Sequence, residues 1–451
     1  HRPLVASPAM NYADIKTADE LRKELKDVNA LDEKERTHFY NLCRVCNAEV
    51  VADGIKLGGK HDIGRRGKTP LIGACRTNNI EAVKLLLAAG ADPNKETDAG
   101  YTALWLSARD GNTECVAELV GKGADPNWME ERSGTTALMV ACNEKHAESA
   151  LALAGAPEIE ADLAEQDGCT SLWVAASEGM CDVVDKLMGI GADINKANNH
   201  QRTPLMAAAL QGHAEMCTKL VEAGADPTAI DENGENSLYM AASSGQVAAL
   251  EMLLGTEKLD VNATSGEGET PLITCSWFGH VDAVNFLIEN GADIELANEH
   301  GKTPLIAACW RNNPAVAEAL LDAGANIHNV DEHGRTALWA ACRGGAMECI
   351  KLLMERGADP DNMDDRQGTF DAGAGVSSCT PLFAAAWQGH VAAIKMMLEM
   401  GADPNRGDSE KRTPLEVTES DDAKAFIQEY IDKWSNGEIP DCPGKGTFVK
   451  P

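Results

Sequence analysis

The sequence predicts an all-helical solenoid, in which short helix–turn–helix repeats stack side by side. A threonine, once replaced by asparagine, recurs at steps of 33 or 34 residues and once at 44, and a leucine follows it two residues later. A Gly-Ala-Asp or Gly-Ala-Asn element then ends nearly every period. Self-similarity at this period indicates stacked repeats in place of one central core. The recurring positions are Thr69, Thr102, Thr136, Thr170, Thr203, Asn236, Thr270, Thr303, Thr336, Thr380 and Thr413.

Residues 300–327 show how one period is expected to fold. Thr303 is a good helix N-cap, and the proline after it suits the first helical position. Pro314 begins a second helix with apolar residues at helical spacing, and Gly324 ends that helix as a C-cap. Neither helix can bury its apolar face alone, so each repeat needs neighbours on both sides.

The period and the Thr303-Pro-Leu signature resemble those of ankyrin repeats, whose unit is a β-turn plus two helices. The resemblance covers roughly residues 61–434, which is eleven repeats. It implies an ankyrin-repeat solenoid with β-turn or hairpin tips. We expect residues 1–60 to form an N-terminal arm and helical cap, and residues 435–451 to form an extended C-terminal tail.

Each end of the array carries its own helical signals. The capping box at Thr17 predicts a helix to about Val28, and a one-sided apolar pattern predicts a second helix from Asp32 to about Ala52. Together they would cover the open end of the first repeat, as terminal repeats of solenoids must. At the other end an apolar stripe predicts a closing helix that contains Ala423, Phe426, Ile427, Tyr430 and Trp434.

The formal net charge of −31 is unevenly spread along the chain. Residues 1–60 hold equal numbers of acidic and basic groups, so the whole excess lies in residues 61–451. Such a field disfavours nucleic acid and anionic membrane surfaces and favours protein partners with a basic surface. Acidity also keeps a long solenoid soluble and monomeric. The sequence is compatible with either role for the charge, partner binding or solubility. No run of the sequence reaches the 18 apolar residues of a membrane span.

The cysteines indicate a reducing compartment. Several of the fourteen stand six residues after an N-cap, where other repeats have alanine. Cysteine there acts as a small apolar residue, and many free thiols are typical of intracellular proteins. We expect the cytoplasm, or an organelle stroma or matrix if the N-terminal histidine reflects processing; a fragment is the alternative. Cys43 and Cys46 have metal-like spacing but no second pair nearby.

The sequence contains no residue set that would support catalysis, so we expect a non-enzyme without cofactor or metal. It lacks a nucleophile elbow, a phosphate-binding glycine loop and an H-E-x-x-H motif. His300 and His333 fall in successive hairpin tips and are close enough in register to approach each other, but further ligands are lacking. Four histidines share the position ten residues after the N-cap, which the resemblance makes structural: His146, His213, His280 and His390.

The candidate binding residues lie seven and eight positions after the N-caps. The resemblance places these positions at the exposed end of the inner helix, facing the concave groove. Trp and Arg dominate binding hot spots, and both gather in the C-terminal repeats. Packing onto a neighbouring helix is the alternative. The candidates are Arg76, Arg109, Trp277, Phe278, Trp310, Arg311, Arg343 and Trp387.

Two further features leave alternatives open. The position three residues after the N-cap lacks the family's histidine and holds apolar groups such as Trp105 and Trp339, which would pack between repeats or contact a partner. An insertion at about 361–378 is either a tolerated surface loop or a partner contact. The sequence as a whole predicts a protein–protein interaction scaffold or adaptor. The alternative is a structural or assembly subunit of a large, possibly organellar, multiprotein complex.

Overall fold

The computed structural model confirms the all-helical fold. It describes residues 11–25, 27–31, 36–62, 67–363 and 379–439, and within these ranges it contains helices and isolated β-bridges but no strand. The chain divides into two compact units, each of which is described by itself. The N-terminal unit comprises His1–Ala208 with Thr218–Asp226, and the C-terminal unit comprises Ala209–Cys217 with Pro227–Pro451.

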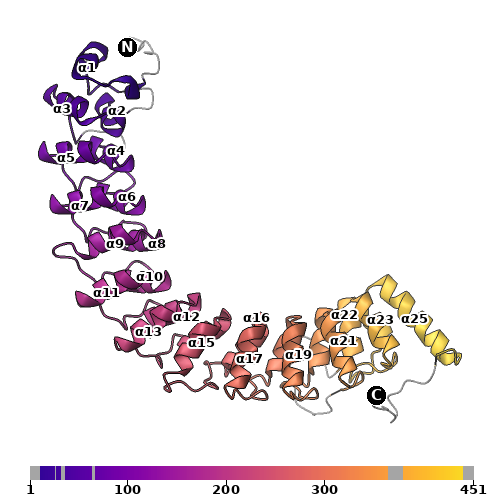
Figure 1. Cartoon of the computed structure of the whole chain (residues 1–451). Helices are drawn as coiled ribbons and strands as arrows, with labels where there is room; N and C mark the ends of the chain where they lie inside the picture. Colours follow the sequence, from indigo (N-terminus) through magenta and orange to yellow (C-terminus); the bar gives the residue numbers. More distant parts are fainter. Residues whose placement is uncertain (1–10, 26, 32–35, 63–66, 364–378, 440–451) are drawn as a thin grey trace. The chain divides into compact units, whose positions relative to one another are not determined.

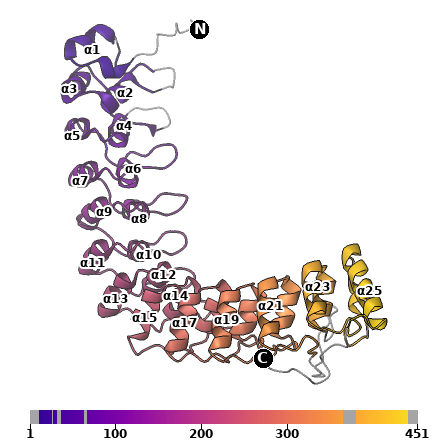
Figure 2. The same cartoon turned by 45° about the vertical axis from the view of Figure 1, so that its right-hand side comes forward.

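Within each unit the helices form two layers. The first helices of successive repeats pack on one another, and so do the second helices, as Figures 1 and 2 both show. The first helices are α2 (His38–Val45), α4 (Pro70–Arg76), α6 (Ala103–Arg109), α8 (Ala137–Asn143), α10 (Ser171–Ser177), α12 (Pro204–Gln211), α14 (Ser237–Ser243), α16 (Pro271–Phe278), α18 (Pro304–Trp310), α20 (Ala337–Gly344), α22 (Pro381–Gln388) and α24 (Pro414–Val417).

The second helices are one or two residues longer in most repeats. They are α3 (Ala48–Lys56), α5 (Ile80–Ala88), α7 (Thr113–Gly121), α9 (Ala147–Ala154), α11 (Cys181–Gly189), α13 (Ala214–Glu222), α15 (Val247–Leu254), α17 (Val281–Glu289), α19 (Pro314–Asp322), α21 (Met347–Glu355), α23 (Val391–Glu399) and α25 (Asp421–Ser435). Near the N-terminus a short 3₁₀ helix, η1 (Tyr12–Asp14), precedes α1 (Ala18–Glu24).

The predicted N-caps begin the first helices. The side chain of Thr303 accepts the backbone N–H of Ile306 at 3.4 Å, and Thr136 accepts that of Met139 at 3.2 Å. Asn236 uses its side-chain oxygen in the same way. Each such bond satisfies a backbone donor that has no partner within its own helix.

The Gly-Ala-Asp elements join neighbouring repeats through an asparagine two residues later. The Asn94 side chain donates to the Gly123 carbonyl oxygen at 3.1 Å and accepts the Asp125 backbone N–H at 2.8 Å. The same pair of bonds recurs at Asn127. The loops therefore fix the register of one repeat on the next.

The core is a continuous layer of small and aliphatic side chains between the helices. Every described cysteine is a free thiol, and all of them except Cys181 are buried. Burial raises the pKa of the Cys142 thiol to about 12 and that of Cys46 to about 11. These thiols are neutral at ordinary pH, so Cys43 and Cys46 pack as apolar groups, as the sequence suggested.

The prediction of one helix from Asp32 to Ala52 is wrong. The described part of this segment forms α2 and α3, which are separated at Cys46 and Asn47. The Asn47 side chain accepts the backbone N–H of Val50 and starts a new helix, a local alternative to helix continuation that asparagine readily offers. Since α2 packs on α4 and α3 on α5, this segment has the two-helix form of a repeat.

The other terminal predictions differ less from the structure. Helix α1 begins after the predicted capping box at Thr17 but ends at Glu24, before Val28. Helix α25 confirms the closing helix: Ala423 and Ile427 are fully buried, and the Tyr430 hydroxyl donates to the Leu398 carbonyl oxygen at 2.6 Å. Most of the insertion (364–378) and the end of the tail (440–451) lie outside the described residues.

Candidate functional site

The predicted binding row lies at the C-terminal ends of the first helices. Arg76 and Arg109 belong to the N-terminal unit. The other candidates belong to the C-terminal unit, on α16 to α22 or directly after them, and these helices pack on one another in sequence order.

Trp277 lies at the joint between two repeats. Its ring is half-buried, with the Lys302 ammonium 4.5 Å and the Arg311 guanidinium carbon 5.1 Å from the ring centroid. Lys302 directly precedes the N-cap of the next repeat, and Arg311 is the C-cap of α18. Two cations therefore contact one indole ring, an arrangement that the ring's negative face stabilises.

Asn313 holds the backbone of this tryptophan. Its side-chain amide donates to the carbonyl oxygens of Ser276 and Trp277, each at 2.9 Å. These carbonyls lie in the last turn of α16 and have no partner within the helix. A side chain of the next repeat thus positions the end of α16.

Trp310 forms a second aromatic and cationic cluster with the following repeat. Its ring centroid lies 6.0 Å from that of Trp339, with an interplanar angle of 34°. Arg335 lies 5.2 Å from the Trp310 centroid and 5.4 Å from that of Trp339. Arg343 lies 5.9 and 5.7 Å from the same two centroids.

Beneath this cluster lies a group of buried side chains, which we call the buried floor. The Trp339 indole N–H donates to the Cys379 sulfur at 3.2 Å, and both side chains pack with Phe383. Trp310 and Val417 pack against the edge of this core. Burial raises the pKa of the Cys379 thiol to about 11, so it remains a neutral acceptor.

The cations at the site differ in their acidic partners. Arg335 is held by Asp331, which is almost fully buried, at 2.7 Å. Arg311 and Arg343 have no carboxylate within ion-pair distance in the part of the chain that the structure describes. Their guanidinium groups therefore keep hydrogen-bond donors that no described carboxylate accepts.

The structure splits the predicted row into exposed and packed members. Phe278 is 52% exposed and Trp387 is 36% exposed, whereas Trp277, Trp310 and Arg343 are half-buried in the contacts above. We name the members of the row in the C-terminal unit, together with the buried Trp339 beneath them, the tryptophan–arginine patch. It consists of Trp277, Phe278, Trp310, Arg311, Trp339, Arg343 and Trp387.

Sequence reasoning overlooked Lys302 and Arg335. Both directly precede an N-cap, as does Arg412, and this shared offset was the available signal. At the position three residues after the N-cap, the packing interpretation agrees with burial: Trp105 is 9% exposed and Trp339 is 6% exposed.

Three of the histidines that stand ten residues after an N-cap link neighbouring repeats. His280 Nε2 donates to the Ser243 carbonyl oxygen at 3.0 Å, and His146 and His390 make equivalent bonds to the preceding first helix. In the hairpin tips, His300 and His333 both approach Glu332, at 2.7 and 3.6 Å. No group of three or more His, Cys, Asp or Glu residues is placed to hold a metal ion among the described residues.

A family model described as Ankyrin repeats (3 copies) matches residues 8–97, 89–167, 172–265, 238–331, 288–364 and 323–408. The chain belongs to the ankyrin-repeat family. The first match begins at residue 8 and so includes α2 and α3, in agreement with their repeat-like packing. Ankyrin repeats are generally protein–protein interaction modules, and the family is typically non-enzymatic.

The individual ankyrin-repeat proteins that match are similar over limited lengths. Ankyrin repeat domain-containing protein 29 of Homo sapiens is 38% identical over 58 residues, which is 13% of this chain and 19% of that protein. The Danio rerio protein of the same name is 40% identical over 58 residues, 13% of this chain and 20% of that protein. The chain thus matches about a fifth of these curated relatives. The crystal structure of the human ASB11 ankyrin repeat domain has a TM-score of 0.43 and 28% identity, covering 51% of this chain and 98% of that one.

No helix in the described ranges combines the length and apolar character needed to cross a membrane.

Proposed function

We propose that this ankyrin-repeat protein is a non-enzymatic scaffold that binds a partner protein on the first-helix face of its C-terminal unit. The observation that carries the proposal is the tryptophan–arginine patch. It gathers exposed aromatic side chains and unpaired guanidinium groups on neighbouring repeats. Aromatic residues and arginine are the side chains most enriched where binding energy concentrates.

The packed members of the patch support binding by limiting its entropic cost. Trp277 is held by two cations and Trp310 by two cations and the Trp339 ring, so they lose little freedom when a partner covers them. Phe278 and Trp387 present the apolar area that a partner would bury. Burying exposed aromatic surface contributes roughly 25 cal/mol per Å² removed from water.

The charge of the chain supports a partner that is basic outside the patch. A net charge of −31 produces a negative field that steers basic proteins towards the solenoid. The patch itself holds two arginines, so this steering acts through the rest of the surface. We also propose a reducing compartment, because the twelve buried free thiols of the described ranges would be vulnerable to disulfide exchange whenever a repeat opened.

The proposal predicts that the exposed aromatics control partner capture. Phe278→Ala with Trp387→Ala should reduce crosslinking of the principal partner in native extract at least tenfold, because each truncation of an interface aromatic costs about 1–3 kcal/mol. Helicity and the melting temperature should change little, since both side chains are exposed. Quantitative crosslinking with mass spectrometry is the measurement.

A matched control removes exposed apolar area elsewhere. Ile190→Ala with Ile230→Ala changes two exposed aliphatic side chains outside the patch and should leave capture intact. Equal capture by the patch variant and the wild type would refute the binding role. Constant co-purification with one large complex, unchanged by the patch variant, would instead support a structural subunit. Trp310→Ala is a poorer probe, because Trp310 packs on the buried floor and its loss should also lower stability.

A further inference from the structure

The acidic charge of the chain is absent from the first helices α2 to α22. From α2 to α22 none of these helices contains Asp or Glu, although the chain has 71 acidic residues. The second helices do carry acidic residues, such as Glu81 on α5 and Glu114 on α7. The first helices instead contain four arginines, Arg44, Arg76, Arg109 and Arg343.

Three of these arginines occupy the same position in three consecutive repeats of the N-terminal unit. Thr37, Thr69 and Thr102 are the N-caps of α2, α4 and α6, and each arginine follows its N-cap by seven residues. Because α2 packs on α4 and α4 on α6, the three positions form a row, which we name the arginine ladder. The ladder is recognised only when α2 is seen to be the first helix of a repeat.

Local packing holds α2, which carries Arg44, close to α4, which carries Arg76. A Cβ atom at Gly73 would lie 2.7 Å from the Tyr40 ring and 3.1 Å from the Arg44 side chain, so glycine allows α2 to lie directly on α4. The Arg44 guanidinium lies over the Tyr40 ring, with its carbon 5.9 Å from the centroid. The Thr77 hydroxyl also donates to the Arg44 carbonyl oxygen at 2.7 Å.

The three arginines of the ladder differ in whether a carboxylate already neutralises their charge. Arg76 is exposed and has no carboxylate within ion-pair distance among the described residues. Arg44 is likewise without such a carboxylate in the ranges that the structure covers. Arg109 lies over Trp105 at 5.7 Å and donates to the Asp110 carboxylate at 2.7 and 2.8 Å. An anionic ligand would therefore meet two guanidinium groups without a described carboxylate, those of Arg44 and Arg76, and one that Asp110 already binds, that of Arg109.

We propose that the arginine ladder binds an extended acidic segment of a partner protein. Neighbouring helices pack about 8–10 Å apart, which equals about three residues of a polyproline II chain at roughly 3.1 Å each, and every third side chain of such a chain lies on the same face. Carboxylates spaced three residues apart therefore match successive rungs. Each guanidinium can bind a carboxylate through two parallel hydrogen bonds. This surface lies in the N-terminal unit and is independent of the tryptophan–arginine patch.

The surrounding charge favours a short acidic peptide over a nucleic acid. Helices α2, α4 and α6 themselves carry no carboxylate, and the Asp110 carboxylate directly after α6 is already bonded to Arg109, whereas a long polyanion would also meet the negative field of the whole chain. The approach of an acidic segment is opposed at long range by that field, so binding should be modest in affinity. Salt should weaken the direct contacts, since the rungs are close to the surface.

The test uses the full chain and a fluorescein-labelled nine-residue peptide, three copies of Glu-Gly-Ala, followed by fluorescence anisotropy. The triple variant Arg44→Gln, Arg76→Gln and Arg109→Gln should weaken binding at least tenfold. Arg76→Gln alone should weaken it at least threefold and, as an exposed change, should leave the melting curve unaltered. A peptide of three Lys-Gly-Ala copies and a labelled nine-nucleotide oligothymidine are compared in parallel.

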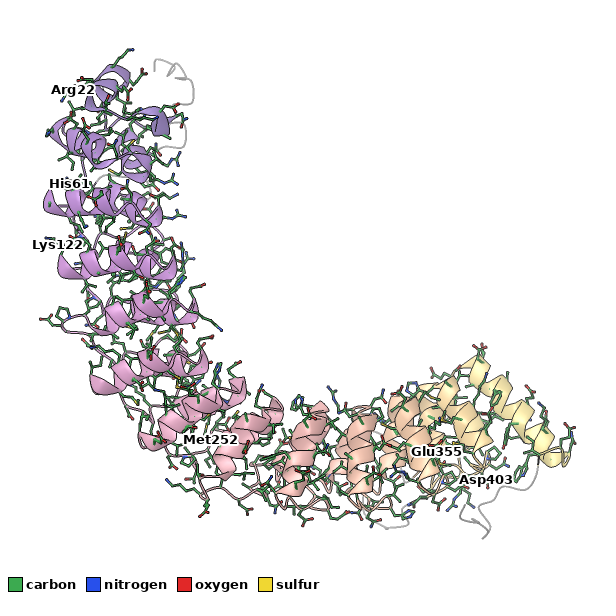
Figure 3. All side chains as sticks on the ribbon, viewed as in Figure 1. Arg22, His61, Lys122, Met252, Glu355 and Asp403 are labelled. Atoms are coloured by element: carbon green, nitrogen blue, oxygen red, sulfur yellow. The ribbon has the colours of Figure 1, made fainter. Side chains whose placement is uncertain are left out.

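A matched variant separates local contact from net charge. Lys56→Gln, Lys84→Gln and Lys122→Gln remove the same total charge from the second-helix layer of the same repeats, where Figure 3 labels Lys122. This variant should change the affinity less than twofold. Equal weakening by the two triple variants would overturn the proposal, as would tighter binding of the lysine peptide. Tighter binding of oligothymidine, lost in the arginine variant, would assign the ladder to single-stranded nucleic acid instead.

Discussion

At the scale of single residues, the joints between repeats depend on pairs of glycine and histidine. Gly245 closes the turn between α14 and α15 with φ of 68°, and the next repeat places His280 against it. A Cβ atom at Gly245 would lie 2.6 Å from the His280 ring. Glycine is required here both by the backbone conformation and by the close approach of the ring.

Gly245→Ala should therefore destabilise the C-terminal unit more than Gly291→Ala does. Both glycines have positive φ, which costs a non-glycine residue about 1–2 kcal/mol, but a Cβ at Gly291 would meet nothing within 4 Å. The clash and the weakened His280–Ser243 bond should raise the cost at Gly245 to about 2–4 kcal/mol. Urea unfolding measures the difference. Adding His280→Ala to Gly245→Ala should relieve the clash, and strictly additive costs would contradict this account.

At the scale of helices, one position serves as a polar link between repeats. The residue ten positions after the N-cap is a histidine in some repeats and an asparagine in others, and either side chain reaches a carbonyl at the end of the preceding first helix. Asn79, for example, donates to the carbonyl oxygens of Cys43 and Cys46 and so ties α2 to the next repeat. Helix ends thus satisfy their free carbonyls across the repeat interface.

Asn313→Ala should loosen the end of α16 and with it Trp277. The variant removes two hydrogen bonds of 2.9 Å and leaves two carbonyls without a protein partner, at a cost of about 1–3 kcal/mol. Melting temperature and partner capture should both fall. Asn290→Ala is the control, because the exposed Asn290 side chain bonds only within its own helix. A similar effect from both variants would argue against the positioning role of Asn313.

At the scale of the whole molecule, stability is expected to be local. In the described ranges the helices of each repeat pack mainly on those of its sequence neighbours, so a solenoid behaves as a chain of nearest-neighbour terms. Phe383 and Phe39 are both almost fully buried, the first in the C-terminal unit and the second in the N-terminal unit. Phe383 lies on α22 and Phe39 on α2, and the helices that pack on α22 differ from those that pack on α2.

Phe383→Ala and Phe39→Ala should consequently give reciprocal patterns of amide hydrogen exchange. Each leaves a cavity that costs about 3–5 kcal/mol. Phe383→Ala should speed exchange in α20, α22 and α23, and leave α4 to α7 protected, while Phe39→Ala should do the opposite. Hydrogen exchange with mass spectrometry resolves the two regions. Uniform loss of protection in both variants would show that the array unfolds as one cooperative body.

The sequence by itself determined the repeat, because its signals are local. An N-cap threonine, a turn glycine and a Gly-Ala-Asp element act within a few residues, and each recurs often enough to exclude chance. The closing helix was predictable for the same reason: its apolar stripe follows from the period of a single helix. Buried cysteines were recognised because alanine replaces them in sister repeats.

Only the tertiary structure decided how the candidate residues are used. Trp277, Trp310 and Trp387 each stand seven residues after an N-cap, so the sequence does not distinguish them. The exposure of each ring depends on which side chain the next repeat places against it. The break between α2 and α3 also escaped prediction, because an apolar helical pattern continues across Asn47 until packing against α4 and α5 selects two helices. Once that break is known, Arg44 aligns with Arg76, and a surface spread over three repeats becomes visible.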